Sequence, residues 1–424
     1  MKIRIYNAVI FTLEDNRAAF NGELWVEDNI ITYVGETKKT DDIVFDKEIN
    51  AEENLLMPSF KNAHTHSAMT FGRNYSDTLR CNEWLEKVIF PIEAKMTEND
   101  VYELSKVSFL EYIMNGITAC FDMYYEPQAM SQLAKEYGFR TVMCGAVNNF
   151  RETPESIEKA FLKYNAMHEF ASYKFGIHAE YTCSLELLEK MADLVRKYKA
   201  PFYTHISETE SEVSGCIKRY GKSPVELLDS IGLFDYGGGV FHGVFLTDEE
   251  LRILSKKNVS IITNPASNLK LASGIARVMN FVDYGINVGI GTDGPASNNS
   301  LDMFKEMYLT SVLQKYRLKD AAACAPELVI AMATKGSAKA MGLYNCDVLA
   351  VGKLADIIMI DLHKPNMQPL NNIPNAIVYS ANPMNVKMTM INGKIVYYNN
   401  EFFIDDDIDK VYSGAKQIVL KLSK

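Results

Sequence analysis

Short apolar runs alternate with longer amphipathic segments along most of the chain. Eight of these runs have the length and the β-branched or aromatic content of buried strands. They begin at Leu55, Gly116, Arg140, Lys174, Pro201, Gly238, Asn258 and Ile286. Intervening segments such as 97–115 and 184–199 carry apolar residues at helical spacing behind a Thr or Ser suited to N-capping. Eight strands alternating with helices predict an α/β fold, the (β/α)8 TIM barrel.

Strand-like segments also lie outside this alternation, at both ends of the chain. Residues 2–12 and 23–35 alternate polar and apolar positions, as do 355–362 and 386–399, where Asn392-Gly393 is a hairpin turn signal. Neither end has enough strands for a core of its own. We therefore expect one small β-sandwich domain built from residues 1–54 and 350–424, with the barrel spanning 55–349.

Composition narrows the class of protein. Of the 424 residues 47% are hydrophobic and 23% are charged, which suits a large folded core. The 44 basic and 54 acidic residues leave a net charge of −10, which disfavours a nucleic-acid or anionic-membrane partner. Seven scattered cysteines without a CxxC pair suggest neither disulfides nor a thiolate zinc site. With neither a signal-peptide core nor a run approaching the ~18 apolar residues of a membrane helix, the expected location is cytoplasmic.

Polar side chains suited to chemistry end six of the eight runs. They include five of the seven histidines, and the full set is His64, His66, Asp122, His178, His205, His242 and Asp293. Because the C-terminal ends of barrel strands meet at one mouth, we expect these side chains to lie close together. Polar residues that merely begin loops would explain one or two of them.

The strongest local signal is His64-Thr65-His66. Residues two apart in an extended segment point the same way, so both imidazoles can reach one ion. An isolated HxH pair is weak, but His205, His242 and Asp293 end strands that lead to the same mouth. The set predicts a divalent metal centre. Glu208, just beyond His205, is interpreted as a general acid/base rather than a solvated loop carboxylate.

Two further motifs match known signatures only in part. Residues 289–294 fit GxGxxG, but these glycines close the last strand instead of opening a helix in a first βαβ unit, which disfavours a dinucleotide site. His178-Ala179-Glu180 has the HxE pattern of cytidine-deaminase-type zinc sites, yet the Pro-Cys pair that those sites require is missing from the sequence. We interpret His178 as a substrate contact, with a buried structural histidine as the alternative.

Several segments together resemble the amidohydrolase superfamily, in particular its branch of 5′-methylthioadenosine/S-adenosylhomocysteine deaminases, which is related to the triazine hydrolases. They are residues 58–77, 83–97, 178–184, 204–213, 264–278 and 291–304. The resemblance runs in order along most of the chain. It implies a distorted barrel that holds one zinc or iron ion, together with a split β domain.

The resemblance also implies residue roles. The metal ligands would be His64, His66, His205 and Asp293, with Zn²⁺ as the expected ion and Fe²⁺ as the alternative. His242 would hydrogen-bond the attacking hydroxide, Glu208 would carry a proton to the purine N1, and Asp293 would help protonate the departing ammonia. Glu93 would contact the ribose hydroxyls and His178 the purine ring.

The implied reaction is hydrolytic deamination of an adenine nucleoside, with a homo-oligomer, dimer or tetramer, as the expected assembly. Candidate substrates are 5′-methylthioadenosine, S-adenosylhomocysteine, adenosine and 5′-deoxyadenosine. Family members that use S-adenosylhomocysteine place arginines after the third strand, where this chain has Cys144 to Asn149, although Arg151 follows closely. Glu180 and Arg277 stand where prolines are common. Deamination is therefore better supported than recognition of a homocysteine tail.

Two alternatives remain at this point. The same metal site could act on another aminated or halogenated N-heterocycle, such as guanine, a pterin, cytosine or a triazine. A catalytically inactive barrel scaffold is the non-enzymatic alternative, but such a protein should have lost a ligand or the proton carrier, and this sequence keeps them all.

Overall fold

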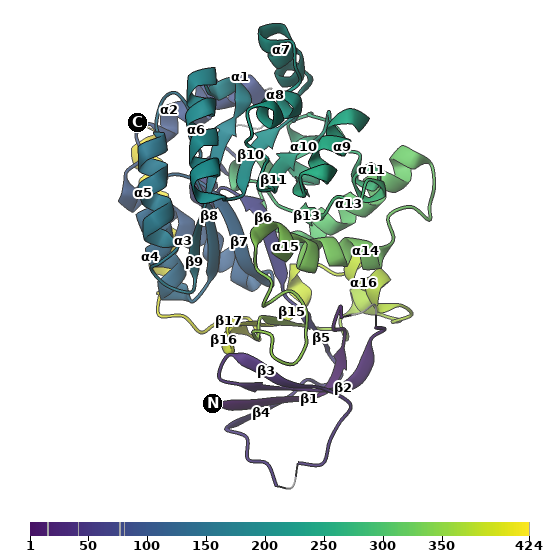
Figure 1. The fold of residues 1–424 in the computed structure, drawn as a ribbon. Helices are drawn as coiled ribbons and strands as arrows, with labels where there is room; N and C mark the ends of the chain where they lie inside the picture. The colour runs from purple at the N-terminus through teal and green to yellow at the C-terminus, as the bar shows by residue number, and fades with distance from the viewer. Residues whose placement is uncertain (15–16, 41, 76–77, 80, 424) are drawn as a thin grey trace.

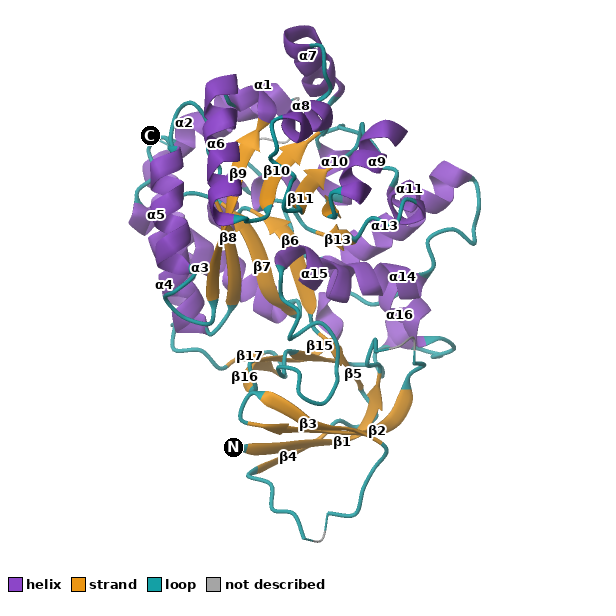
Figure 2. Cartoon of the chain, viewed as in Figure 1, coloured by secondary structure: helices purple, strands orange, loops and turns teal. Residues whose placement is uncertain are grey.

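Two β-sheets, one of them ringed by helices, make up the protein (Figures 1 and 2). The computed structural model describes residues 1–14, 17–40, 42–75, 78–79 and 81–423. In the figures the barrel lies above the sheet formed by the chain ends, and its strands point away from that sheet. The C-terminal strand ends, which the sequence marks with polar residues, therefore gather at the free end of the barrel.

The barrel sheet contains eight strands in sequence order, and every ladder between neighbours is parallel. They are β6 (Phe60–Thr65), β7 (Ile117–Met123), β8 (Arg140–Cys144), β9 (Ala171–Ala179), β10 (Phe202–Ile206), β11 (Gly238–His242), β12 (Val259–Thr263) and β13 (Val288–Ile290). The predicted (β/α)8 barrel is confirmed.

Closure of the barrel brings His64 and Asp293 together. The first and last strands are joined beyond β13 by Asp293 N donating to His64 O at 3.0 Å. Asn62 also exchanges hydrogen bonds with Thr292, donating to its Oγ1 at 2.7 Å and accepting from its amide at 2.9 Å. A Cβ on Gly291 would lie 2.7 Å from His64 N, so this approach requires glycine.

Helices cover the outside of the barrel and carry the expected caps. Thr97, Thr153, Thr209, Ser223 and Thr247 each accept a backbone amide at a helix start. The helices are α1 (Cys81–Trp84), α2 (Phe90–Glu93), α3 (Glu98–Met114), α4 (Pro127–Tyr137), α5 (Pro154–Tyr164), α6 (Leu185–Tyr198), α7 (Glu210–Tyr220), α8 (Pro224–Ser230), α9 (Asp248–Lys256), α10 (Pro265–Lys270), α11 (Val278–Asp283), α12 (Pro295–Asn298), α13 (Met303–Leu318), α14 (Pro326–Ala331), α15 (Ser337–Met341), α16 (Ile373–Tyr379) and α17 (Ile408–Leu422).

Strands from both chain ends form the second sheet, as expected. Its order is β17-β16-β15-β14-β5-β1-β2-β3, and β4 also pairs with β1. The strands are β1 (Lys2–Ile10), β2 (Phe20–Glu27), β3 (Ile30–Gly35), β4 (Lys47–Asn50), β5 (Leu55–Pro58), β14 (Ile357–Ile360), β15 (Val386–Ile391), β16 (Lys394–Tyr398) and β17 (Glu401–Phe402). Asn392 and Gly393 both have positive φ in the β15–β16 turn, which the Asn-Gly pair predicted.

The first barrel strand lies later in the chain than the sequence pattern indicated. Leu55–Pro58, expected to begin the barrel, is β5 and pairs with β1 and β14 of the terminal sheet. The barrel begins with β6 at Phe60. Both strands are buried throughout and only Ser59 separates them, so burial shows no break where the chain passes from one sheet to the other.

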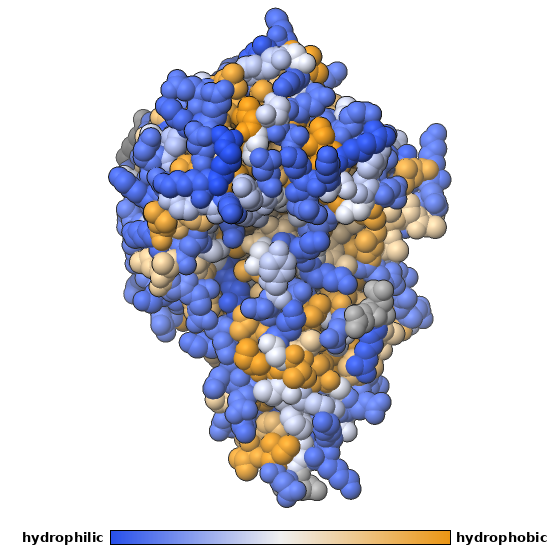
Figure 3. Space-filling view, in the orientation of Figure 1, coloured by the Kyte–Doolittle hydropathy of each residue, from blue (hydrophilic) through white to orange (hydrophobic). Residues whose placement is uncertain are grey.

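The face seen in Figure 3 is mostly polar, and the described cysteines are buried in the interior. Polar side chains cover most of the face shown in Figure 3, and apolar ones gather in smaller patches. Among the described residues, no helix is both long enough and apolar enough to cross a membrane. Six cysteines are described, all buried and free of disulfides, while the side chain of Cys81 lies outside the described part.

Candidate active site

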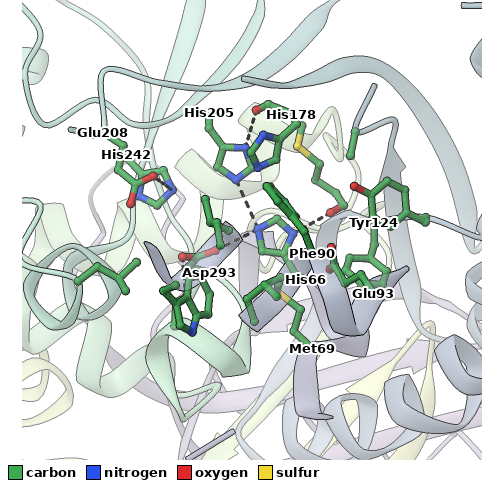
Figure 4. A pocket seen from close by; sticks show the side chains of 18 of the residues that line it. His66, Met69, Phe90, Glu93, Tyr124, His178, His205, Glu208, His242 and Asp293 are labelled. Atoms are coloured by element: carbon green, nitrogen blue, oxygen red, sulfur yellow. Dashed lines mark hydrogen bonds and ion pairs between the residues drawn. The ribbon is translucent and has the colours of Figure 1, made fainter. Parts of the chain in front are cut away.

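Three imidazoles and a carboxylate, carried by the ends of three strands, meet at the free end of the barrel; Figure 4 shows His66, His205 and Asp293 of this group. The potential ligand atoms of His64, His66, His205 and Asp293 all lie within 4.8 Å of one another. His64 belongs to β6 and His66 follows it, His205 belongs to β10, and Asp293 follows β13. The convergence expected from the sequence is therefore present.

Backbone carbonyls fix the orientation of two of the imidazoles. His66 Nδ1 lies 2.7 Å from Met123 O, and His205 Nδ1 lies 2.7 Å from His178 O. Because a carbonyl oxygen only accepts, each Nδ1 carries a proton, and each ring in its neutral form has its lone pair on Nε2. These two Nε2 atoms are 3.4 Å apart, and His66 Nε2 is 3.1 Å from Asp293 Oδ1.

The third imidazole is held by packing. The His64 ring stacks on Phe241 with 3.8 Å between ring centroids. Among the described residues, neither ring nitrogen of this buried histidine has a hydrogen-bond partner. Its Nε2 points toward the same carboxylate, 3.5 Å from Asp293 Oδ1.

The Asp293 carboxylate has one occupied and one inward-facing oxygen. Oδ2 accepts hydrogen bonds from Ser267 Oγ at 2.6 Å and from Ser297 Oγ at 2.7 Å. Oδ1 faces the imidazoles of His64 and His66. Two neutral donors on one oxygen thus leave the other free to bind a cation.

The pKa values of the three imidazoles diverge, because burial and the Asp293 carboxylate act on them in opposite directions. Burial lowers the pKa of His64 to about 3 and that of His205 well below its ordinary value. Burial would also lower the pKa of His66, but its contacts with Asp293 raise that pKa to about 9. Lone pairs and a carboxylate converging in a dry pocket are the ligand set that a divalent metal prefers. The four residues therefore fit a mononuclear metal site.

Glu208 and His242 lie beside this metal-binding group. His242 Nδ1 donates to Asn268 Oδ1 at 2.7 Å, which turns Nε2 into the pocket. That Nε2 is 3.9 Å from Glu208 Oε2, and Glu208 Oε1 accepts from Ser273 Oγ at 3.3 Å. A carboxylate and an imidazole beside the candidate metal ligands can together move protons to and from a bound nucleophile.

Glu93 and His178 line another part of the same pocket, as Figure 4 shows. The space between the lining residues, open solvent included, is about 630 Å³. Burial raises the pKa of Glu93, partly offset by the Tyr124 hydroxyl and the charge of His66. Burial lowers the pKa of His178 to about 4. The pocket thus presents a carboxyl group and a neutral imidazole to a ligand.

Three other residues discussed from the sequence are placed outside the metal-binding group. Asp122 is buried on β7, where its Oδ2 accepts the amide of Ser67 at 3.1 Å. Glu180 pairs with Arg219 at 2.6 Å, and Arg277 pairs with Asp248 at 2.8 Å. Glu180 and Arg277 thus form ion pairs outside the pocket and do not line it.

Sequence reasoning missed the side chains that hold the site residues. Ser267, Asn268 and Ser297 bond to Asp293 or His242, and none was singled out beforehand. A usable signal existed, because Pro-Ala-Ser-Asn occurs twice, at 265–268 and 295–298. Each copy begins a short helix directly beyond a barrel strand, α10 after β12 and α12 after β13.

Three residues that follow or end strands at this mouth have strained backbone conformations. Ser207, His242 and Asp293 have φ of 50°, 70° and 57°, in the left-handed region that non-glycine residues rarely adopt. Such conformations cost about 1 kcal/mol or more each and persist where the surrounding contacts enforce them. Here they turn functional side chains into the pocket at the ends of β10, β11 and β13.

Comparison with known proteins agrees with this site. The family model described as "Amidohydrolase family" matches residues 55–396. The chain belongs to the amidohydrolase family. Its relatives include a 5-methylthioadenosine/S-adenosylhomocysteine deaminase of Thermoanaerobacter pseudethanolicus, 36% identical over 98% of both chains. A 5'-deoxyadenosine deaminase of Methanosarcina acetivorans is also 36% identical, over 99% of both.

A solved structure supports the same family assignment for the fold. The zinc-bound adenosine deaminase of Xanthomonas campestris matches with a TM-score of 0.93 and 27% identity, over 99% of this amidohydrolase and 98% of that chain. The barrel, the terminal sheet and their arrangement are therefore shared along nearly the whole length.

Proposed function

We propose that this amidohydrolase is a metal-dependent hydrolytic deaminase of adenine nucleosides, which forms the inosine analogue and ammonia. One observation carries the proposal: Glu208 and Glu93 line a single pocket on either side of the metal-binding group. In this proposal the first carboxylate transfers protons and the second binds the ribose hydroxyls. A bare heterocycle would give the second carboxylate nothing to bind. Full-length relatives named as adenine-nucleoside deaminases support this substrate class.

In this scheme His64, His66, His205 and Asp293 hold the metal, which we propose to be Zn²⁺ because the ligands are imidazole and carboxylate. The bound ion supplies an acidified water, with a pKa of about 7, as the nucleophile. Metal analysis of the purified protein, with one zinc expected per chain, tests the choice of ion. An equimolar content of iron would contradict it.

The chain's own residues then direct the protons. Glu208 accepts a proton from the attacking water and delivers it to N1 of the ring, while His242 Nε2 accepts a hydrogen bond from the nucleophile. C6 becomes tetrahedral. The remaining proton of the added hydroxyl passes by way of Asp293 to the amino group, the C–N bond breaks, and ammonia leaves as the oxygen becomes the carbonyl of the inosine analogue. His178 binds the purine and Glu93 the ribose, which together hold C6 over the metal-binding group.

A hollow beside the pocket suggests which 5′ groups fit. Phe90, Glu93 and Tyr125 line both spaces, and Asn148, Phe150 and Arg151 complete the hollow. The Arg151 guanidinium lies 4.0 Å above the Tyr125 ring, donates to Glu93 O at 3.0 Å and is 3.7 Å from Glu126 Oε1. Because this cation already has partners and its surroundings are aromatic, we propose a preference for small apolar 5′ groups over a homocysteine tail.

Turnover of a substrate panel tests the function. Zinc-loaded protein should consume 5′-methylthioadenosine and 5′-deoxyadenosine faster than S-adenosylhomocysteine, with loss of adenine absorbance and equimolar ammonia. Glu208→Gln should lower kcat by about 10²- to 10⁴-fold, the usual contribution of general acid/base catalysis. The exposed neighbour Glu210 provides the control, since Glu210→Gln should retain wild-type kcat. Turnover of guanine or a triazine in place of every adenine nucleoside would reject the proposal.

A further inference from the structure

The loop between β10 and α7 is held by an unusual carboxylate contact. Glu212, on the first turn of α7, accepts two consecutive backbone amides: Ser207 N at 2.7 Å on Oε1 and Glu208 N at 2.9 Å on Oε2. Its side chain is buried, at 5% exposure. Both donors belong to the segment that carries the Glu208 carboxylate into the pocket.

Two other helices of this chain show what a glutamate at this position ordinarily does. In α8 and α9 the third helical residue accepts the amide of its own N-cap: Glu226 that of Ser223 at 2.8 Å, and Glu250 that of Thr247 at 2.7 Å. Each glutamate therefore completes a capping box with its N-cap residue and stabilises only the start of its own helix.

The first turn of α7 has the same Thr-x-x-Glu spacing but a different outcome. Thr209 Oγ1 accepts the Glu212 amide at 3.2 Å, as in a capping box. The Glu212 carboxylate, however, bonds to the amides one and two residues before the N-cap. Glu212 therefore binds the backbone of Glu208 instead of capping only its own helix.

That backbone needs support. Ser207 has φ of 50°, a strained conformation that reverts unless neighbouring contacts enforce it. Beyond the backbone, the Glu208 side chain makes a 3.3 Å hydrogen bond from Ser273 and lies 3.9 Å from His242 Nε2. Because the side chain starts from this segment, fixing the two amides also fixes the region that the Glu208 carboxylate can reach.

We propose that Glu212 is a positioning residue of the deaminase reaction, which bridges the Ser207 and Glu208 amides and so fixes the general acid/base over the metal-binding group. This inference rests on the proposed role of Glu208. It predicts that Glu212 matters for the rate of proton transfer and little for the binding of substrate or metal, because Glu93, His178 and the four ligands lie elsewhere.

Glu212→Gln tests the bridge with minimal change in shape. Glutamine offers one carbonyl oxygen, and its NH2 group would face a second N–H donor, so one amide loses its partner. We expect kcat to fall by about 10- to 100-fold, as for a small misplacement of a catalytic group, with KM within about twofold of wild type. Zinc content should remain at the wild-type level.

Glu250→Gln is the matched control. Glu250 is buried at 1% exposure, occupies the same helical position and also accepts a backbone amide, but far from Glu208 in the sequence and on another helix. It should lose comparable stability and keep wild-type kcat. An equal loss of kcat in both variants would assign the effect to general destabilisation and overturn the positioning role.

Amide hydrogen exchange provides a readout independent of activity. In the zinc-loaded wild type the amides of Ser207 and Glu208 should be protected, and Glu212→Gln should speed their exchange at least tenfold, whereas Glu250→Gln should leave them unchanged. Unchanged exchange, or full kcat in Glu212→Gln, overturns the inference. If Glu208→Gln instead keeps full activity, the proposed role of Glu208 fails, and the exchange rates still decide whether Glu212 holds this loop.

Discussion

At the scale of single residues, the metal-binding group depends on two serine hydroxyls that hold the Asp293 carboxylate from outside the group. Ser267 and Ser297 both donate to Asp293 Oδ2 and so fix which oxygen turns toward the imidazoles. Partners of metal ligands typically contribute 10- to 100-fold to affinity. We expect Ser267→Ala and Ser297→Ala each to weaken zinc binding by about tenfold, measured by competition with a chelator.

A serine of the same segment serves as the control. Ser300 bonds to Asn298 Oδ1 at 3.4 Å and makes no contact with Asp293, so Ser300→Ala should retain wild-type zinc affinity. Wild-type affinity in both the Ser267 and Ser297 variants would show that the carboxylate orients itself without them.

The convergence of most of the predicted site residues could be foreseen from the sequence because one rule covers them. Polar residues at the C-terminal ends of parallel strands converge wherever the strands close into a barrel, whatever their separation along the chain. The supporting groups follow no such rule. Met123 and His178 hold imidazoles through their backbone carbonyls, which every residue type possesses, and Glu212 departs from the capping pattern that its spacing predicts.

At the scale of elements, α13 joins the two short helices that carry these serines. Glu306 on α13 accepts the amide of Ala266 at 3.0 Å and the side chain of Asn298 at 2.8 Å. Burial raises the pKa of Glu306 from 4.5 to about 7. Between these values the folded protein binds more protons than the unfolded chain, so this residue's contribution to stability falls as pH rises.

Replacing Glu306 should remove that dependence. Glu306→Gln carries no titratable group, so its free energy of unfolding relative to wild type should increase steadily from about pH 5 to about pH 8. Urea denaturation of the two proteins at several pH values measures this difference. A constant difference across the range would show that Glu306 ionises normally in the fold.

Strand β5 shows where element-level prediction fails. Only Ser59 separates it from β6, and an apolar run indicates burial without indicating the sheet in which a strand is buried. The assignment of Leu55–Pro58 to the terminal sheet follows instead from pairing with β1 and β14, which come from opposite ends of the chain. Such long-range pairing leaves no local trace in the sequence.

At the scale of the whole molecule, a buried charge cluster joins the base of the barrel to the terminal sheet. Asp356, just before β14, accepts Arg140 Nε at 2.8 Å and Nη2 at 3.1 Å, and the amide of Asn392 at 2.9 Å. Lys61 Nζ is 3.9 Å away, with its side chain fully buried. Although burial alone would raise it, these two cations hold the pKa of Asp356 below its ordinary value.

Asp356→Asn should therefore destabilise the molecule as a whole. It removes the only negative charge that the described contacts place between two buried cations, a change that costs about 3–5 kcal/mol when a buried pair is broken. Glu249→Gln, which breaks an exposed pair with Arg252 on α9, should cost less than about 1 kcal/mol.

Urea unfolding followed by both tryptophan fluorescence and circular dichroism measures the effects of Asp356→Asn and Glu249→Gln. Trp25 lies in β2 of the terminal sheet and Trp84 in α1 at the barrel, so fluorescence reports on both parts of the molecule. Loss of coupling between the sheets should separate the unfolding transition seen by fluorescence from that seen by circular dichroism. Coincident transitions with near wild-type stability would show that apolar packing alone holds the sheets together.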